Sequence, residues 1–184
     1  MYIPNLLTLL RILLVPLTVW LVISDELRMA FAVLLIAGAT DGIDGFLAKR
    51  FAWTSELGAY LDPLADKLLL VSTFIALGAR ALLPSWLVIL VVSRDIMIVA
   101  AILLSLVVGP RVQVKPIFIS KFNTLAQILL ALLVLADTGF QLGLNTLKLA
   151  LILLTGLLTA ASAGAYLWAW LSSMSGAKKL GEGK

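Results

Sequence analysis

The sequence of 184 residues contains no cysteine and no histidine. Without cysteine the chain can form neither a disulfide nor a thiolate nucleophile. Without histidine it lacks histidine zinc ligands and histidine general bases. Any catalytic chemistry is therefore expected to rest on carboxylates.

Charge is also scarce. Only 13% of the residues are charged, 62% are hydrophobic, and the mean hydropathy is +1.11. A soluble domain is about half apolar and about a quarter charged. This composition predicts an integral membrane protein, and with a net charge of only +4 the position of each charge matters more than the total.

Long apolar runs dominate the chain, and a membrane span needs about 20 such residues. Six segments qualify, at residues 3–23, 29–50, 58–79, 82–107, 117–136 and 145–171. The first carries Arg11 within its apolar run and has no basic region ahead of it, so we expect a retained span rather than a cleaved signal. The sequence predicts an all-α bundle of six transmembrane helices over residues 1–172, followed by a disordered cytoplasmic tail over 173–184.

Lysine and arginine indicate the orientation, because they concentrate in cytoplasmic loops. With the amino terminus inside, eight basic residues fall in inner loops and the tail, against three in outer loops. The inner set is Lys49, Arg50, Arg111, Lys115, Lys121, Lys178, Lys179 and Lys184, and the outer set is Arg28, Arg80 and Lys148. Both termini are therefore expected to be cytoplasmic.

Four aspartates stand out in this apolar background: Asp41, Asp44, Asp62 and Asp66. An ionisable group at membrane depth is costly and usually functional. The two pairs have helical i, i+3 and i, i+4 spacing, so each pair shares one helix face. They are expected to face each other, roughly 6 to 13 Å from the inner ends of the second and third helices. The sequence thus predicts a polar chamber open to the cytoplasm.

Four unpaired carboxylates in such a chamber would repel each other unless cations neutralise them. Lys49 and Lys67 supply part of that charge. Oxygen ligands suit hard ions such as Mg²⁺ or Mn²⁺, and four carboxylates can hold two of them around a phosphorus centre. Intramembrane aspartates also serve ion pathways, so ion transport remains the alternative at this point.

The stretch from Asp41 to Asp66 resembles the signature of the CDP-alcohol phosphotransferases, D-x2-D-G-x2-A-R-x8-G-x3-D-x3-D. Seven of its eight fixed positions match, and only the arginine differs, as Lys49. The resemblance implies a six-helix membrane enzyme, usually a homodimer, that joins an alcohol to a CDP-linked lipid and releases CMP. It also implies that Asp41, Asp44 and Asp62 bind two Mg²⁺ or Mn²⁺ ions and that Asp66 is both a metal ligand and the catalytic proton acceptor.

The same resemblance implies a binding site for the CDP-lipid. Its residues would be Asn5, Thr8, Gly45, Lys49, Ser55 and Gly58. Lysine keeps the charge of arginine but lacks its bidentate fork, so either Lys49 or Arg50 contacts the pyrophosphate. Helix packing is the alternative role for Gly58, and a capped helix start is the alternative role for Asn5 and Thr8.

Two further stretches, Gln113–Gln127 and Thr159–Tyr166, are similar to the mitochondrial-type cardiolipin synthases, as is the Ser93–Asp95 triplet. This similarity implies that CDP-diacylglycerol reacts with phosphatidylglycerol to give cardiolipin; the alternative acceptor is glycerol 3-phosphate, giving phosphatidylglycerophosphate. Arg94, Lys121 and Asn123 are the predicted acceptor-binding residues, with a polar clamp between helices as the structural alternative. Gly156 and the alanines of residues 160–165 are candidates for a dimer contact. The expected setting is a bacterial inner membrane with the active site facing the cytoplasm and no nucleic-acid partner.

Overall fold

The structure is a computed structural model that describes residues 3–51, 56–108 and 118–181. Side chains are described for residues 10–40, 65, 67–100 and 119–168. Described residues form six α-helices and no strand, which confirms the predicted all-α fold. The helices are α1 (Ile3–Ile23), α2 (Leu27–Phe51), α3 (Glu56–Ala79), α4 (Ser85–Val108), α5 (Phe118–Phe140) and α6 (Asn145–Gly181).

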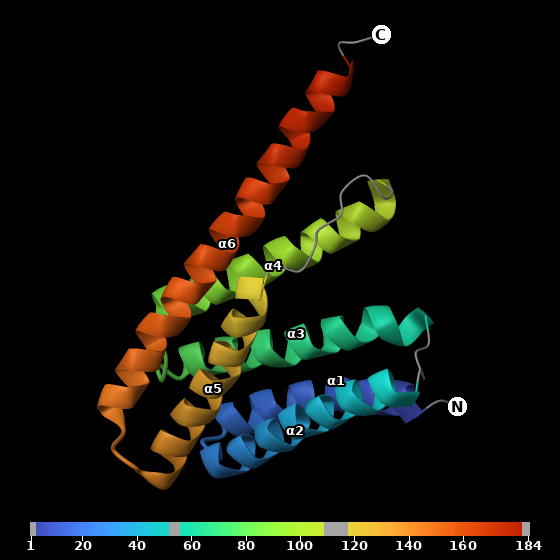
Figure 1. Ribbon diagram of the computed structural model, residues 1–184. Helices are drawn as coiled ribbons and strands as arrows, with labels where there is room; N and C mark the ends of the chain where they lie inside the picture. The colour runs from blue at the N-terminus through green and yellow to red at the C-terminus, as the bar shows by residue number, and fades with distance from the viewer. Residues whose placement is uncertain (1–2, 52–55, 109–117, 182–184) are drawn as a thin grey trace.

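The helices pack in a closed order that differs from their order in the chain (Figure 1). Helix α1 lies against both α2 and α3, α3 packs on α4, and α4 packs on α6. Helix α6 in turn packs on α5, and α5 returns to α2, while α3 also touches α5. Residues that are far apart in the sequence, on α3 to α6, can therefore meet inside the bundle.

Three short connections lie at one end of the bundle, after α1, α3 and α5 (Figure 1). Each contains a residue other than glycine with positive φ: 68° at Asp25, 54° at Ala81 and 55° at Gln141. Such left-handed residues commonly terminate helices. Arg80 donates a hydrogen bond of 2.5 Å to Asp25, and Arg28 Nε donates one of 2.7 Å to the carbonyl of Gly139. These contacts tie the three connections together.

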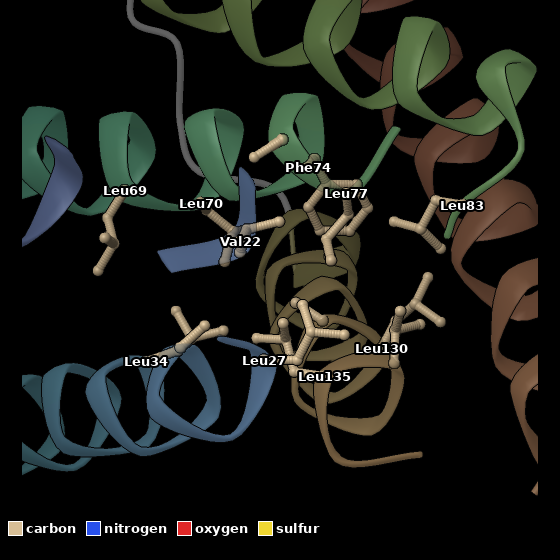
Figure 2. Close-up of a cluster of buried hydrophobic side chains, with 14 of the residues drawn as sticks. Val22, Leu27, Leu34, Leu69, Leu70, Phe74, Leu77, Leu83, Leu130 and Leu135 are labelled. Carbon is tan, nitrogen blue, oxygen red and sulfur yellow. The ribbon is translucent and has the colours of Figure 1, made fainter. Parts of the chain in front are cut away.

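Among the described side chains, a cluster of buried apolar residues packs between the helices (Figure 2). Its buried side chains come from all six helices, with Val22, Phe74, Leu77, Leu130 and Leu135 among the most deeply buried. Each belongs to the part of its helix that approaches the three connections.

The helix bounds agree with the predicted segments except at two ends. Helix α5 continues to Phe140 rather than ending at 136, and the Asp137 carboxylate then accepts a hydrogen bond of 2.7 Å from the Leu144 amide. The sequence predicted a disordered tail from residue 173, whereas α6 continues to Gly181. The extension contains Met174, Ala177 and Leu180 along with lysines, all of which are good helix formers.

Two helices within the described residues are long and apolar enough to cross a membrane. They are Ile119–Phe140 and Asn145–Trp168. The described apolar stretches of α1, α2 and α3 are shorter, at Leu10–Ile23, Leu27–Thr40 and Lys67–Ala79. By length and composition, α5 and α6 meet the requirement for crossing a membrane.

Candidate functional site

The four aspartates lie on the two helices that flank residues 52–55. Asp41 and Asp44 fall in the last turns of α2, and Asp62 and Asp66 fall in the first turns of α3. Asp41 lies ten residues before the end of α2 at Phe51, and Asp66 lies ten residues after the start of α3 at Glu56. Each distance along the helix is about 15 Å. Helical backbone at all four positions confirms that each pair shares one face of its helix. Their side chains lie outside the described residues, so the metal assignment remains a prediction.

The donor set fits a hard divalent cation. Four carboxylates offer oxygen alone, which Mg²⁺ and Mn²⁺ prefer and which suits zinc less well. Among the side chains that the structure describes, no group of three or more acidic residues could hold a metal ion. The signature aspartates of α2 and α3 are not among those side chains.

The predicted CDP-lipid residues gather at the same end of the bundle. Asn5 and Thr8 lie in the first turns of α1, Gly45 and Lys49 lie near the end of α2, and Gly58 lies at the start of α3. Figure 1 shows the start of α1, the end of α2 and the start of α3 at this end, opposite the three short connections. Ser55 and all the side chains of this group lie outside the described residues. Their contacts with a nucleotide remain predicted.

Arg94 lies on α4 in the interior, with 1% of its surface exposed. Its Nη1 donates a hydrogen bond of 2.5 Å to Asp95 Oδ1, and its Nη2 donates one of 2.5 Å to Ser120 Oγ on α5. Both Nη2 and Nε reach Ser162 Oγ on α6, at 2.8 and 3.2 Å. The guanidinium also lies 5.9 Å from the centre of the Tyr166 ring. Every guanidinium nitrogen therefore has a partner within the protein, as in the polar clamp that the sequence left as the alternative.

Asp95 connects this clamp to α3. Its Oδ1 atom accepts a second hydrogen bond, of 2.8 Å, from the Lys67 ammonium, while Oδ2 has no partner among the described residues. The Asp95 side chain is 1% exposed and that of Lys67 is 21% exposed. Because Lys67 directly follows Asp66, this ion pair brings the interior of α4 next to the aspartate segment of α3.

A ladder of polar side chains continues between α5 and α6. Beyond the Ser120–Arg94–Ser162 bridge, Thr159 Oγ1 donates a hydrogen bond of 2.8 Å to Asn123 Oδ1. One helical turn further along the chain on α5 lies Gln127, and one turn earlier on α6 lies Thr155. Both are fully buried, and neither the Gln127 amide nor the Thr155 hydroxyl has a partner among the described residues. The Asn123 Nδ2 atom likewise has none.

The structure brings two of the three predicted acceptor residues into this buried region. Arg94 and Asn123 take part in the polar contacts, whereas Lys121 is exposed beside Ser120. The sequence interpretation missed Ser162, Thr159 and the Lys67–Asp95 pair. The serine and threonine were detectable as a polar stripe at helical spacing in the apolar α6. Nothing in sequence spacing linked Lys67 to Asp95, since they lie on different helices.

Gly156 packs inside the protomer. A methyl group added there would come within 2.9 Å of the Trp86 ring on α4. Its small size therefore serves the contact between α4 and α6. A similar addition at Gly164 would meet no atom within 4 Å, so that position sits in open space.

A polar cavity of about 370 Å³ lies at the opposite end of the bundle. It is lined by Asp25, Glu26, Leu27, Arg28, Thr138, Gly139 and Gln141. No residue predicted for catalysis or lipid binding lines it.

Three characterised relatives align with large parts of the chain. A human protein named cardiolipin synthase (CMP-forming) is 36% identical over 180 residues, covering 89% of this chain and 60% of the human protein. A Bacillus subtilis (strain 168) protein named CDP-diacylglycerol–glycerol-3-phosphate 3-phosphatidyltransferase is 34% identical over 155 residues, covering 76% of this chain and 79% of its own length. A chloroplastic protein of Oryza sativa subsp. japonica with the same activity in its name is 36% identical over 154 residues, covering 74% of this chain and 47% of its own length.

The family model described as CDP-alcohol phosphatidyltransferase matches residues 1–171. The match includes both aspartate pairs, the first five helices and α6 as far as residue 171. It agrees with the signature spacing between Asp41 and Asp66 and with the helical backbone at those positions. This chain belongs to the CDP-alcohol phosphatidyltransferase family.

Proposed function

We propose that this protein is a membrane enzyme that transfers the phosphatidyl group of CDP-diacylglycerol to an alcohol and releases CMP. The observation that carries the proposal is the spacing of Asp41, Asp44, Asp62 and Asp66 on two helices, within a chain matched by the family model over residues 1–171. The buried polar contacts of α4, α5 and α6 lie beside this segment and form the acceptor side of the site.

In the proposed reaction, an acceptor hydroxyl attacks the phosphorus that carries the diacylglycerol. A new oxygen–phosphorus bond forms, the bond from that phosphorus to CMP breaks, and Asp66 accepts the proton of the hydroxyl. The other aspartates, with Asp66, would hold two Mg²⁺ or Mn²⁺ ions, which would neutralise charge on the pyrophosphate. Asn5, Thr8, Gly45, Lys49, Ser55 and Gly58 would bind the CDP-lipid.

Phosphatidylglycerol is the proposed acceptor, and the product is then cardiolipin. The support is similarity over 89% of this chain to the human relative named cardiolipin synthase (CMP-forming). Arg94, Lys121 and Asn123 are assigned to the acceptor side. Glycerol 3-phosphate is the second candidate, because the Bacillus subtilis relative is named for that acceptor and aligns over 79% of its own length.

The proposed setting is a bilayer crossed by all six helices, with both termini and the active site on the cytoplasmic side of a bacterial inner membrane. Large apolar side chains on the outside of the bundle support it, including Leu13, Leu157 and Trp168 with 68%, 72% and 77% of their surfaces exposed. Such a surface is unfavourable in water and favourable against lipid. A homodimer is proposed from the family alone.

The test is an acceptor competition with purified protein in detergent. CDP-diacylglycerol is supplied with phosphatidylglycerol or with glycerol 3-phosphate, and both CMP and the lipid product are identified. We expect CMP and cardiolipin with the first acceptor, and loss of both on addition of EDTA. Phosphatidylglycerophosphate as the main product would replace the acceptor assignment. Release of no CMP with either acceptor would disprove the proposed enzyme activity.

A further inference from the structure

Asp95 occupies an unusual position for a group that belongs to neither the aspartate signature nor the predicted acceptor set. It is buried on α4, and one of its oxygens accepts hydrogen bonds from two cations on two helices. Burying a carboxylate is strongly unfavourable unless it is paired, and the ion pairs with Arg94 and Lys67 offset that cost. Such charge-assisted bonds are short and directional.

The contacts of Asp95 extend across four helices. Lys67 of α3 binds Asp95 of α4, whose neighbour Arg94 binds Ser120 of α5 and Ser162 of α6. Ser120 directly precedes Lys121, and Lys67 directly follows Asp66. A chain of polar contacts therefore runs from the neighbour of the proposed base to the neighbour of a proposed acceptor residue.

This geometry controls the rotation of α3 about its own axis. Side chains on a helix surface lie about 5–6 Å from the helix axis, so a rotation of about 10° moves them by roughly 1 Å. A misplacement of about 1 Å in a reacting group can lower the rate by about 100-fold. Anchoring Lys67 to a rigid partner on α4 limits that rotation one residue away from Asp66.

We propose that Asp95 is a positioning residue for the transfer reaction. Through Lys67 it fixes the rotation of α3 about its own axis at the residue next to Asp66, and through Arg94 it keeps α4 in register with α5 and α6. This inference rests on the proposed function of Asp66. It assigns to Asp95 no contact with either substrate.

The test compares wild-type protein with Lys67→Met, which removes the ammonium and keeps most of the side-chain length. Arg94 still pairs with Asp95 in this variant, so the protein is expected to fold. CMP release is measured against CDP-diacylglycerol and against the acceptor, together with thermal unfolding in the same detergent. We expect kcat to fall by about 10- to 100-fold while both KM values stay within about threefold. The matched control is Arg80→Met, which removes an exposed ion pair with Asp25 at the other end of α3 and should leave kcat within about twofold.

A second variant tests the pairing itself. Asp95→Asn keeps the shape and one acceptor oxygen but loses the charge, and we expect a lower kcat here too. Because both substitutions break the same contact, the double variant should be no slower than the slower single variant, within about threefold. If Asp95→Asn does not fold, the Lys67→Met result alone decides.

The outcomes that overturn the inference are distinct. Positioning is refuted if kcat is unchanged in Lys67→Met, or if activity falls only in proportion to the folded fraction. It is also refuted if the fold-decrease in kcat of the double variant equals the product of the two single decreases. A raised KM for CDP-diacylglycerol with unchanged kcat would make Lys67 a substrate contact instead. Wild-type protein that releases no CMP would overturn the proposed function and this inference with it, whereas active wild-type protein with unaffected variants overturns this inference alone.

Discussion

Arg94 shows how fully a buried cation can be committed to its own protein. Its guanidinium bonds Asp95, Ser120 and Ser162 and is covered by the Tyr166 ring. In a bilayer such contacts replace the water that the charge would otherwise need. Arg94 therefore contributes to stability whether or not it also contacts an acceptor.

We predict that Arg94→Met lowers the free energy of unfolding by about 2–4 kcal/mol. Breaking a buried ion pair usually costs about 3–5 kcal/mol, and here Lys67 still pairs with Asp95 and offsets part of the loss. Thermal unfolding in detergent measures the change, with the exposed Arg80→Met as control. An unchanged unfolding temperature together with a raised acceptor KM would contradict a structural role and identify Arg94 as a ligand contact.

Asp66 is the residue on which the proposed chemistry depends most. We predict that Asp66→Asn keeps the fold and lowers kcat for CMP release by about 10²- to 10⁴-fold, the range typical for loss of a general base. The matched control is Asp137→Asn at the other end of the bundle. There the amide oxygen can still accept the hydrogen bond from the Leu144 amide, so activity should persist. Substantial activity in Asp66→Asn would assign proton acceptance to another group.

At the scale of elements, α5 and α6 are joined by polar contacts in steps. The bridge through Arg94 and the Asn123–Thr159 bond are satisfied, whereas the Gln127 amide and Thr155 hydroxyl have no described partner. A buried polar group without a hydrogen bond costs about 1–3 kcal/mol. The unpaired Gln127 amide therefore weakens the contact between α5 and α6, whereas the adjacent Asn123–Thr159 hydrogen bond strengthens it.

This contrast predicts opposite effects at adjacent steps. Gln127→Leu should raise the free energy of unfolding by about 1 kcal/mol, because a side chain of similar size no longer buries an unpaired amide. Thr159→Val should lower it by about 1 kcal/mol, since it removes the bond to Asn123. Chemical or thermal unfolding of both variants in one detergent gives the comparison. A destabilised Gln127→Leu would show that a water molecule or lipid group binds that amide.

The sequence was sufficient to predict where the helices begin and end, but not how each helix is rotated about its axis in the bundle. Apolar runs and breakers placed the six helices within a few residues, and the stretch from Asp41 to Asp66 carried the family resemblance. The ion pair between Lys67 and Asp95 could not be predicted, because it depends on how α3 and α4 are rotated against each other. Packing among several helices determines these rotations, and the periodicity of a single segment does not predict them. The polar stripe on α6 could be predicted in part, because the sequence shows the spacing of its residues but not their partners on other helices.

At the scale of the whole molecule, the described apolar core and the signature aspartates belong to different parts of the helices. Apolar side chains such as Phe74 and Leu130 belong to the described core (Figure 2). The signature aspartates lie toward the end of α2 and the start of α3, which are consecutive helices in the chain. With no bound cation, repulsion among four carboxylates would oppose the approach of α2 to α3. Divalent ions should therefore act on the stability of the bundle as well as on turnover.

We predict that Mg²⁺ or Mn²⁺ raises the unfolding temperature of the wild-type protein even without substrate. An ion that binds only the folded state stabilises it by about 2.7 kcal/mol at a concentration 100 times its Kd. Asp44→Asn should reduce this shift in unfolding temperature, because it removes a ligand charge. Asp137→Asn should retain the shift, because Asp137 lies near the end of α5 at the three short connections, away from the aspartate segment. The measurement is thermal unfolding in EDTA followed by titration with each ion, and Ca²⁺ serves as a comparison for ion size. A shift of equal size in the wild type and in Asp44→Asn would place the stabilising ion elsewhere and would remove the aspartate segment as the metal site.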